Sequence, residues 1–454
     1  MSTKNRYNEY WKLGRPEYNT GIYTYNAHGE LEVHENGNVY NLHELVKKYD
    51  SPLRVFIPSV VTSRVAGVYD AFERAIKQKK YSGSFEYHYP MKSNQTKEAV
   101  EAVLKGGAHI EVTSANELVR IGGLWKKGKT RKNLRVLCNG PKSEAYRKAI
   151  LHFFNEGMAI VPIIENQAEF TLFDWYPGEL GIRVDLDITV DSHWNKDLNR
   201  FGLSEEEVYA LPTRKNLTVF HFHVGSQVGT GRSLLSAVKH GASVYKKLRE
   251  TQPALSIFDM GGGFTVPYTK NKKLYDPYDI ADGVVRILKQ TFPRQPDLHP
   301  DIVVEWGQYA VAPSQCLIYK VIFEKDIPKA EIQKKWYIVD GSFMNDLTDT
   351  WSIGQTWHIL PVNNVKNKLT PVWLAGSSCD SDDEYRVDDL ELPKIAKNGE
   401  PLYIAVLDTG AYQEALAGNH CLLGNPAKIS LQKGNDKLIY GRDVKLGHLD
   451  WKGK

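Results

Sequence analysis

Lys92 is the residue of this sequence whose position first suggests covalent chemistry. It follows Tyr89-Pro90-Met91, at the end of an aromatic and apolar run that starts at Phe85. A lysine held among apolar neighbours can have its pKa lowered far enough for the amine to attack a carbonyl group. By itself, a lysine is most often a solvated surface residue, so its meaning depends on the residues that accompany it.

Two histidines, His221 and His223, occupy alternate positions at the end of another apolar run, which places them on the same side of a strand. An HxH pair can bind a divalent metal ion. Here the pair is followed by Gly225-Ser226-Gln227 and has no convincing further ligands, so we expect no metal site. The other interpretation is an imidazole ring that stacks on a flat ligand.

A triple glycine and a carboxylate stand at the ends of two further apolar runs. Gly261-Gly262-Gly263 would let backbone amides approach an anion such as a phosphate, although a tight turn explains three glycines equally well. Glu305 follows the apolar residues 302–304, where a carboxylate must find a partner or bear a large desolvation cost. A protonated heterocyclic nitrogen would be such a partner.

Together these positions offer an amine, an imidazole ring, a phosphate-binding loop and a carboxylate. Pyridoxal phosphate needs these four kinds of contact, because its aldehyde, ring face, phosphate and ring nitrogen each require a partner. The combination is much more specific than any of its parts. It predicts a site for this cofactor.

The elements that must position these residues are short apolar runs that alternate with helical patterns. Eight such runs, each apolar nearly throughout, predict the parallel strands of a closed (β/α)8 barrel, a TIM-like fold. In such a barrel the functional groups lie at the C-terminal ends of the strands, which is where the residues above are found. The expected strands are Phe85 to Met91, His109 to Thr113, Leu134 to Cys138, Ala159 to Ile164, Leu180 to Asp185, Thr218 to Val224, Ser256 to Met260 and Ile302 to Trp306.

On both sides of the barrel the pattern is rich in β-structure. The first segment alternates around Asn36-Gly37, a dipeptide that supplies the positive φ angles of a tight hairpin turn. After Pro313 the helical spacing fades and β-rich pieces return. We therefore predict an α/β protein with an N-terminal β-segment (1–52), a barrel (53–312) and a C-terminal β-rich domain (313–454) that the N-terminal segment completes.

The composition argues against several classes of protein. The chain has 454 residues, and 58 Lys and Arg against 54 Asp and Glu give a net charge of +4, without the basic surface that nucleic acids require. Its longest apolar stretch, 157–164, is too short to cross a membrane, and the N-terminus lacks the apolar run of a signal peptide. The four cysteines form no CxxC pair, which is typical of free thiols in a reducing compartment. We expect a cytoplasmic protein.

Three motifs of this sequence resemble those of the fold type III pyridoxal-phosphate decarboxylases, whose barrel is of the alanine-racemase-like kind. The family includes ornithine, diaminopimelate and biosynthetic arginine decarboxylases, and the resemblance is closest to the arginine decarboxylases. It spans Leu53 to Leu431, and the shorter bacterial members match the length best. The motifs are Tyr89-Pro90-Met91-Lys92-Ser93-Asn94-Gln95, His221-Phe222-His223-Val224-Gly225-Ser226-Gln227 and Gly410-Ala411-Tyr412-Gln413-Glu414.

The resemblance implies a role for each matching residue around the cofactor. It implies that Lys92 bonds to the cofactor's aldehyde carbon, that His223 stacks on the ring and that Glu305 pairs with the pyridinium nitrogen. The other cofactor contacts that it implies are Ser226, Gly261, Gly262, Gly263 and Tyr412 at the phosphate, Arg183 beside the cofactor and Glu111 near the Lys92 amine.

A fourth motif, Cys379-Asp380-Ser381-Asp382-Asp383, matches the CDSxD element of the same family. The resemblance implies that Cys379 is the group that protonates the α-carbon after CO2 has left. In the family this element reaches the active site of the partner subunit. The resemblance therefore implies a homodimer with shared active sites.

The acids of this element bear on the substrate. A carboxylate that binds a cationic side chain in a buried site contributes about 1.5 to 3 kcal/mol, so Asp380, Asp382 and Asp383 favour a basic amino acid. Asp346 and Asp349 are a second source of such a carboxylate, and the sequence does not choose between the two groups. By likeness, the expected reaction is the decarboxylation of L-arginine to agmatine and CO2 in polyamine biosynthesis, ahead of that of lysine, ornithine or diaminopimelate.

Two other functions fit part of the pattern. A fold-related amino-acid racemase would share Lys92 and the phosphate-binding loop, but the CDSxD element argues against it. A non-catalytic regulator that binds a partner protein would not need Lys92, Glu305 and Cys379 together. We therefore expect an enzyme that acts on a small amino acid and has no nucleic-acid or membrane partner.

The sequence departs from the family next to Glu305. Where the family usually has Glu-Pro-Gly-Arg, this chain reads Glu305-Trp306-Gly307-Gln308, so the arginine expected beside the phosphate is missing. Our hypothesis is that backbone amides and Tyr412 hold the phosphate without it.

The substitution Gln308→Arg tests this hypothesis. If the phosphate is already held, the new guanidinium changes the dissociation constant of the cofactor by less than about tenfold, which corresponds to about 1.4 kcal/mol. The constant is measured by equilibrium dialysis against pyridoxal phosphate. A gain in affinity of several orders of magnitude would show that the native site lacks a phosphate contact that it needs.

Overall fold

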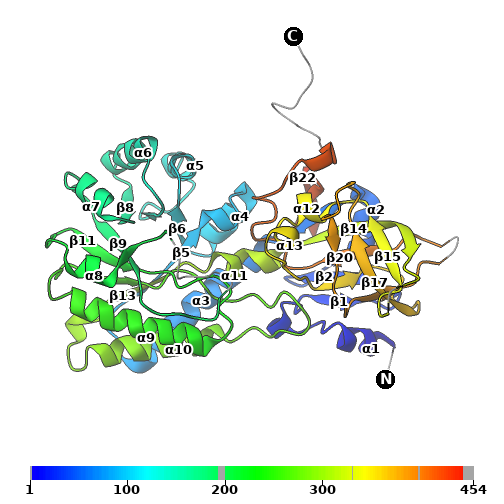
Figure 1. Ribbon diagram of the computed structural model, residues 1–454, viewed down its shortest axis with the longest axis horizontal. Helices are drawn as coiled ribbons and strands as arrows, with labels where there is room; N and C mark the ends of the chain where they lie inside the picture. The colour runs from blue at the N-terminus through cyan, green and yellow to red at the C-terminus, as the bar shows by residue number, and fades with distance from the viewer. Residues whose placement is uncertain (1–2, 193–199, 330, 397–398, 443–454) are drawn as a thin grey trace, which may run out of the picture. The chain divides into compact units, whose positions relative to one another are not determined.

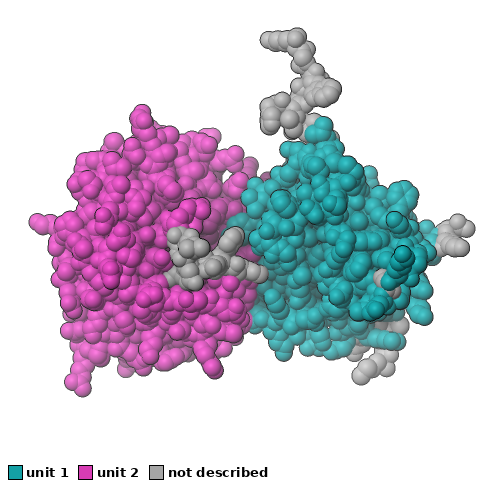
Figure 2. Space-filling model, in the orientation of Figure 1, with its two compact units in different colours: residues 1–61, 266–274, 311–454 teal, residues 62–265, 275–310 magenta. Residues whose placement is uncertain are grey.

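The structure of the protein is a computed structural model that describes residues 3–192, 200–329, 331–396 and 399–442 (Figure 1). The described residues fall into two compact units (Figure 2). The barrel unit comprises residues within 62–265 and 275–310, and the β unit comprises residues within 1–61, 266–274 and 311–454.

The barrel unit contains a closed barrel of eight parallel strands in the order β9-β11-β12-β13-β5-β6-β7-β8, which closes where β8 pairs with β9. Each expected apolar run overlaps one of these strands, so the predicted barrel is confirmed. A short strand, β10 (Leu203–Ser204), pairs with β9 outside the ring. The eight are β5 (Phe85–Pro90), β6 (His109–Val112), β7 (Arg135–Cys138), β8 (Ala159–Ile164), β9 (Leu180–Asp185), β11 (Leu217–His221), β12 (Ile257–Asp259) and β13 (Asp301–Val304).

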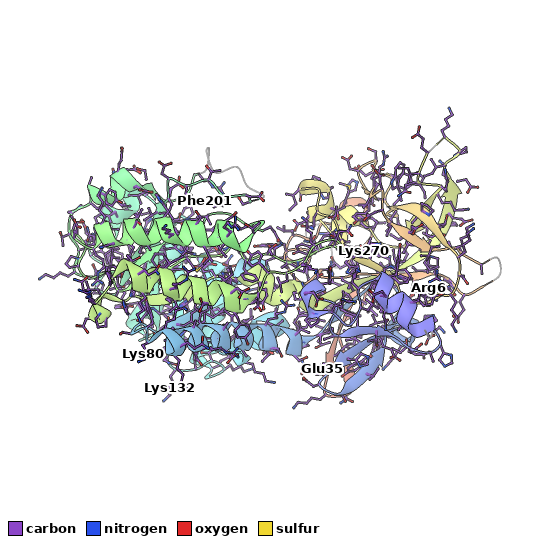
Figure 3. The ribbon with its side chains drawn as sticks, turned by 90° about the horizontal axis from the view of Figure 1, so that it is seen from below. Arg6, Glu35, Lys80, Lys132, Phe201 and Lys270 are labelled. Atoms are coloured by element: carbon purple, nitrogen blue, oxygen red, sulfur yellow. The ribbon has the colours of Figure 1, made fainter. Side chains whose placement is uncertain are left out.

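Helices follow the strands and cover the outside of the barrel, and the two longest helices of its second half, α9 and α10, run side by side (Figures 1 and 3). Ser204 and Glu207 form a reciprocal capping box at the start of α8, which satisfies backbone amides that the helix itself leaves unpaired. The helices are α3 (Pro58–Lys79), η2 (Met91–Ser93), α4 (Lys97–Lys105), α5 (Ala115–Lys126), α6 (Glu144–Asn155), α7 (Gln167–Leu172), α8 (Glu205–Tyr209), α9 (Gly231–Leu248), α10 (Pro277–Thr291), η3 (Pro296–Leu298) and α11 (Gly307–Val311).

The β unit begins with a small antiparallel sheet of β1 (Tyr23–Tyr25), β2 (Leu31–Glu35) and β3 (Asn38–Asn41). The β2–β3 hairpin turns at Asn36 and Gly37, whose φ angles of +48° and +84° are the positive values that the sequence suggested. The helical elements of this segment are α1 (Thr3–Tyr10), η1 (Pro16–Tyr18) and α2 (Leu42–Tyr49).

The rest of the β unit is a mixed sheet of ten strands, in which β4 pairs with β14 in antiparallel and with β21 in parallel orientation. Its strands are β4 (Leu53–Phe56), β14 (Gln315–Asp326), β15 (Lys335–Val339), β16 (Ile359–Pro361), β17 (Leu369–Ala375), β18 (Glu384–Tyr385), β19 (Glu391–Pro393), β20 (Tyr403–Val406), β21 (Ala427–Gln432) and β22 (Asn435–Tyr440). Its helical turns are η4 (Ala312–Ser314), α12 (Phe343–Asp346), α13 (Asp349–Ser352) and η5 (His420–Leu422).

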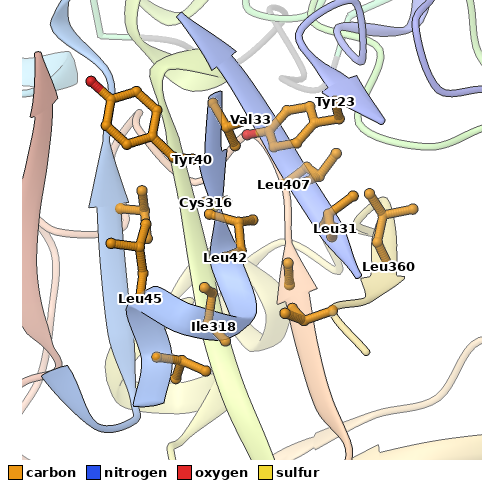
Figure 4. Packing of buried hydrophobic residues seen from close by; sticks show 14 of the residues in the cluster. Tyr23, Leu31, Val33, Tyr40, Leu42, Leu45, Cys316, Ile318, Leu360 and Leu407 are labelled. Atoms are coloured by element: carbon orange, nitrogen blue, oxygen red, sulfur yellow. The ribbon is translucent and has the colours of Figure 1, made fainter. Parts of the chain in front are cut away.

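The N-terminal segment supplies a large part of the core of the β unit. Leu31, Val33 and Leu42 pack in one buried cluster with Ile318 and Leu360, which come from the second half of the chain (Figure 4). The prediction that the N-terminal segment completes the C-terminal β-rich domain is therefore confirmed.

The unit boundaries differ from the expected ones at two places. Strand β4, which the boundary at residue 53 would place in the barrel, pairs only with strands of the β unit among the described residues. All four of its residues are buried, three of them apolar and one the charged Arg54, and its strand pairing assigns it to the β unit. The segment 266–274 also belongs to the β unit, although it lies within the barrel sequence.

The part of the chain that the structure describes contains no candidate membrane-spanning helix. None of its helices has both the length and the apolar character that spanning a bilayer requires.

The core of the β unit yields a stability prediction. Leu31 is fully buried in the shared cluster, so Leu31→Ala should lower the free energy of unfolding by about 2 to 5 kcal/mol through lost burial and the cavity that remains. Val39, on the neighbouring strand, is 53% exposed, and Val39→Ala should cost less than about 1 kcal/mol. Urea unfolding of both variants measures the difference. Equal costs would mean that the N-terminal hairpin does not stabilise the unit.

Candidate active site

Lys92 lies in η2, directly after strand β5, and its amine contacts an acid on the next strand. Lys92 Nζ donates a hydrogen bond of 3.2 Å to Oε2 of Glu111 on β6. Glu111 is fully buried, and its other oxygen accepts a hydrogen bond from Thr113 Oγ1. Because 49% of the Lys92 side chain is exposed, the amine is anchored by the carboxylate and is still accessible to a ligand.

Glu305 follows β13 and is buried, with Asn139 at the end of β7 as its hydrogen-bond donor (Nδ2 to Oε1, 3.0 Å). Burial and the neighbouring Asp259 carboxylate raise the pKa of Glu305 to about 8, against the opposing charges of His221 and Lys92. Glu305 therefore holds a proton at neutral pH. A basic nitrogen bound beside it could take up that proton.

His223 stands two residues after His221, and its imidazole ring has a hydrogen-bond partner of its own. Its Nδ1 accepts a hydrogen bond of 3.2 Å from the backbone N–H of Gly262. Burial, followed by the charges of Arg183 and Lys92, lowers the pKa of His223 well below its usual value. The ring is therefore neutral, with any proton on Nε2, as suits a residue that stacks on an aromatic ligand.

The triple glycine is required by the packing of the strand ends. Gly261 and Gly263 have φ angles of +63° and +112°, and a Cβ on Gly261 would lie 2.4 Å from the carbonyl oxygen of Phe222. A Cβ on Gly262 would lie 3.1 Å from the carbonyl oxygen of Glu305. The loop thus presents bare backbone to the mouth of the barrel, where side chains would fill the space.

Two of the three N–H groups of this loop already have partners within the site. The N–H of Gly261 donates to Asp259 Oδ1 at 2.9 Å, and that of Gly262 donates to His223 Nδ1. Less of the loop is therefore available to an anion than the sequence suggested. The loop positions an acid and an imidazole as well as leaving room for a ligand.

Arg183, on β9, and Ser226, after β11, border the same mouth. The Arg183 guanidinium lies 3.4 Å from Oε1 of Glu165, which follows β8, and its Cζ lies 4.5 Å from the centre of the Phe201 ring, labelled in Figure 3. Ser226 is half-buried in a turn that the hydrogen bond from the N–H of Val228 to the carbonyl of Gly263 ties to the glycine loop. These contacts fix the positions of both residues.

Three residues of this site were missed by the sequence reasoning: Asn139, Glu165 and Asp259. Each stands at or just after the C-terminal end of a barrel strand, so the rule that located Lys92 and Glu305 could have found them. Their partners could not be inferred, because these depend on which strands are neighbours in the closed barrel.

The residues present fit pyridoxal phosphate. The mouth combines an accessible amine, a neutral half-buried imidazole, a buried carboxyl group that holds a proton, and a loop without side chains. These are the groups that an aldehyde, a ring face, a ring nitrogen and a phosphate would contact.

The other predicted site residues lie in the β unit. Cys379 is exposed, and its Sγ lies 4.0 Å from Sγ of Cys421. Tyr412 is half-buried with a φ of +65°, a left-handed conformation that is costly for a residue with a Cβ. The neighbouring Gln413 donates a hydrogen bond of 2.7 Å to Asp349 Oδ2, which ties this turn to α13.

Asp346 and Asp383, two of the candidate substrate acids, are buried and have partners in their own unit. Asp383 accepts hydrogen bonds from the backbone N–H groups of Phe343, Met344 and Ser378, at 2.7 to 3.2 Å. Burial raises the pKa of Asp346 to about 6, although the charge of Arg54 opposes this shift.

Asp380 and Asp382 are the candidate acids that keep access to solvent. Asp382 is exposed, and its backbone N–H donates to Asp380 Oδ1 at 3.0 Å. Asp380 is partly exposed, and its Oδ2 lies 3.3 Å from Nε2 of His420. With Asp346, Asp349 and Asp383 engaged in buried contacts, these two carboxylates are best placed to meet a cation from outside.

The sequence of this chain is similar to that of pyridoxal-dependent decarboxylases. Residues 68–312, more than half of the chain, match the model of the pyridoxal-binding domain of pyridoxal-dependent decarboxylases. The biosynthetic arginine decarboxylase of Pseudomonas putida is 24% identical over an alignment of 558 positions that covers 94% of this chain and 87% of that protein. That of Vibrio vulnificus is 26% identical, with 93% and 88% covered.

Two solved structures share the fold along nearly the whole chain. The biosynthetic arginine decarboxylase of Campylobacter jejuni has a TM-score of 0.79 and 21% identity, with 93% of this chain and 88% of that one covered. The diaminopimelate decarboxylase of M. jannaschii also has a TM-score of 0.79, with 22% identity and 94% and 96% covered.

The raised pKa of Glu305 predicts how the stability of the cofactor-free protein varies with pH. The folded protein keeps the Glu305 proton up to about pH 8, whereas the unfolded chain releases it near the ordinary value of 4.5. Because the folded state binds more protons in this window, the contribution of Glu305 to stability falls as the pH rises through it. Urea unfolding at several pH values should show this fall in the native protein.

Glu305→Gln should make the same profile flatter, because glutamine carries no titrating proton. Glu73→Gln, a change of the same type at an exposed position of α3, is the matched control and should follow the native profile. Parallel profiles for the native protein and Glu305→Gln would contradict the raised pKa.

Proposed function

Because the chain belongs to the pyridoxal-dependent decarboxylase family, we propose that it converts L-arginine to agmatine and CO2. Family membership confirms the cofactor, pyridoxal phosphate, and the enzyme class, an amino-acid carboxy-lyase, that the sequence predicted. The observation that carries the proposal is the mouth of the barrel, where the Lys92 amine and the buried Glu305 carboxyl group face one site beside the glycine loop.

Lys92 and Glu305 have separate tasks in this proposal. Bound pyridoxal phosphate supplies a conjugated ring that accepts the electrons left on the α-carbon when CO2 departs. The Lys92 amine, oriented by Glu111, would hold the cofactor by its aldehyde group. Glu305 gives its proton to the ring nitrogen and remains beside it as a carboxylate.

His223 and Arg183 hold the ring. The neutral His223 imidazole is locked in one orientation by the N–H of Gly262, so it can pack on the ring face without adding a charge. Arg183 is held by Glu165 and by the Phe201 ring. We assign Ser226, the glycine loop and Tyr412 to the phosphate, in accordance with the family motifs.

Cys379 and the acids beside it act on the substrate. The exposed Cys379 thiol is the proposed proton donor to the α-carbon. Asp380 and Asp382 are the proposed partners of the substrate's guanidinium group, because the other three candidate acids are engaged in buried contacts. Since the family brings this element to the site of a partner subunit, we also propose a homodimer.

The relatives favour arginine over other amino acids. They are named biosynthetic arginine decarboxylases, and their alignments cover nearly the whole of this chain. Diaminopimelate is the second candidate, because a diaminopimelate decarboxylase has an equal TM-score and covers this chain equally well. Its distal carboxylate would need a cation, however, and the accessible groups of the CDSxD element are acids. Lysine, ornithine and a racemase reaction rank below both.

A decarboxylation screen tests the proposal. The purified protein, loaded with pyridoxal phosphate, is incubated with L- and D-arginine, lysine, ornithine and diaminopimelate, and CO2 release and loss of optical activity are measured. We expect the highest kcat/KM for L-arginine. Faster turnover of diaminopimelate would replace the substrate assignment, and racemisation without CO2 would replace the reaction.

Two variants accompany the screen. Lys92→Ala should lower kcat by at least about a thousandfold and leave no cofactor adduct after borohydride reduction and peptide mapping. Asp382→Asn should raise KM for arginine about tenfold or more with a smaller change in kcat, because it removes a charge partner of the side chain. Lys97→Ala, an exposed lysine on α4, is the matched control for Lys92.

A further inference from the structure

A buried ion pair lies behind Glu305, and none of the roles assigned above uses it. His221 is the last residue of β11, Asp259 is the last residue of β12, and the two are direct register partners on neighbouring parallel strands. His221 Nδ1 lies 2.9 Å from Asp259 Oδ2. The two side chains are 1% and 0% exposed, so water does not screen their charges.

The backbone fixes both members of this pair. The N–H of Gly261 donates to Asp259 Oδ1, which turns Oδ2 toward His221. The same His221 Nδ1 lies 4.0 Å from Glu305 Oε1, the oxygen that also accepts a hydrogen bond from Asn139. One imidazole nitrogen therefore faces two carboxyl groups at the end of the barrel.

The charges around the pair favour a protonated His221. Burial alone lowers the pKa of His221, but the Asp259 carboxylate, together with Glu305 whenever it is ionised, outweighs burial and raises the pKa above its usual value, against the opposing charge of Arg183. A cation held by the same three side chains would require a neutral imidazole, because metal ligands must be deprotonated. The acids around His221 therefore favour a proton on the ring.

The other charged groups that face Glu305 come from β6 and from η2, which follows β5, the strand next to β13. Glu111 raises its pKa and Lys92 lowers it, whereas His223 is neutral. Lys92 is also the residue assigned to the cofactor, so its positive charge changes when the amine forms a covalent bond. His221, whose Nδ1 lies 4.0 Å from Glu305 Oε1, forms no such bond.

We propose that His221, held by Asp259, is a positioning residue that supplies the positive charge which allows Glu305 to release its proton to a ligand nitrogen. The proton leaves the Glu305 carboxyl oxygen and bonds to the nitrogen, and His221 keeps its own proton. The carboxylate then lies between two cations. Without the charge of His221, ionising Glu305 would place a second carboxylate beside Asp259 in a buried site, so Glu305 would hold its proton more tightly.

This inference rests on the proposed role of Glu305, and its main test needs no bound cofactor. Infrared spectroscopy of the cofactor-free protein detects the carbonyl stretch of the protonated Glu305 carboxyl group, which is identified by its loss in Glu305→Gln. The intensity of this band against pH gives the midpoint at which Glu305 ionises. We expect His221→Asn to move the midpoint up by about one pH unit or more.

A double variant separates a charge effect from a structural one. Asp259→Asn removes a negative charge beside Glu305, so we expect it to lower the midpoint by itself and to bring it back toward the native value when combined with His221→Asn. The dissociation constant of pyridoxal phosphate should follow the same order, about tenfold or more weaker in His221→Asn and partly restored in the double variant. A purely structural role would weaken the double variant further.

His88→Asn is the matched control, because His88 is a buried histidine of the same barrel that lies 3.0 Å from a different carboxylate, Glu86 Oε2. It should leave the Glu305 midpoint unchanged. The inference is overturned if His221→Asn leaves the midpoint where it is, or if the double variant ionises at a higher pH than His221→Asn. If His221→Asn does not fold, His221→Gln takes its place, and an unchanged midpoint in that variant overturns the inference.

The proposed function fails by a different result. If Glu305→Gln binds pyridoxal phosphate and turns over arginine like the native enzyme, then Glu305 does not serve the ring nitrogen. The titration of Glu305 in the cofactor-free protein would still show whether His221 controls its charge.

Discussion

The site at the mouth of the barrel depends on one constraint, the burial of the Glu305 carboxyl group beside other acids. Glu305 sits at the end of β13 within reach of Asp259 and Glu111, and each negative charge there makes the next one more costly. The amide of Asn139, the imidazole of His221 and the amine of Lys92 offset this cost from three other strand ends. The chemistry of the site follows from the same arrangement, because a carboxyl group whose ionisation is costly keeps its proton until a bound base can take it up.

Most of the fold could be predicted from the sequence, because parallel strands that are covered on both faces read as short, continuous apolar runs. All eight barrel strands were found in this way. The predicted boundary at residue 53 differs from the observed one at β4, which was not among the eight predicted runs: Leu53–Phe56 is buried on both faces like a barrel strand, although it contains the charged Arg54, and it pairs within the mixed sheet. The segment 266–274 lies between two barrel elements in the sequence, so its place in the β unit became visible only in the folded chain.

The sequence predicted those site residues that can be recognised by their position at the end of a strand. It did not predict contacts that depend on which side chains become neighbours in the folded chain. Lys92, His223 and Glu305 stand at strand ends, and the structure brings them to one mouth. The ion pair of His221 with Asp259 depends on the register between β11 and β12, which the sequence does not state. Likewise, Asp382 and Asp383 are adjacent and chemically identical in the sequence, yet one is exposed and the other is bound by three backbone amides.

The carboxylate of Asp383 has a consequence for the thiol four residues before it. Because three main-chain amides converge on this one side chain, the path of the chain around Cys379 is already settled when the β unit folds. The loop loses its conformational entropy when the β unit folds. Binding of a ligand therefore does not have to order the loop again. A substitution at Asp383 would therefore first disturb the position of the Cys379 thiol, in a protein whose barrel residues are unchanged.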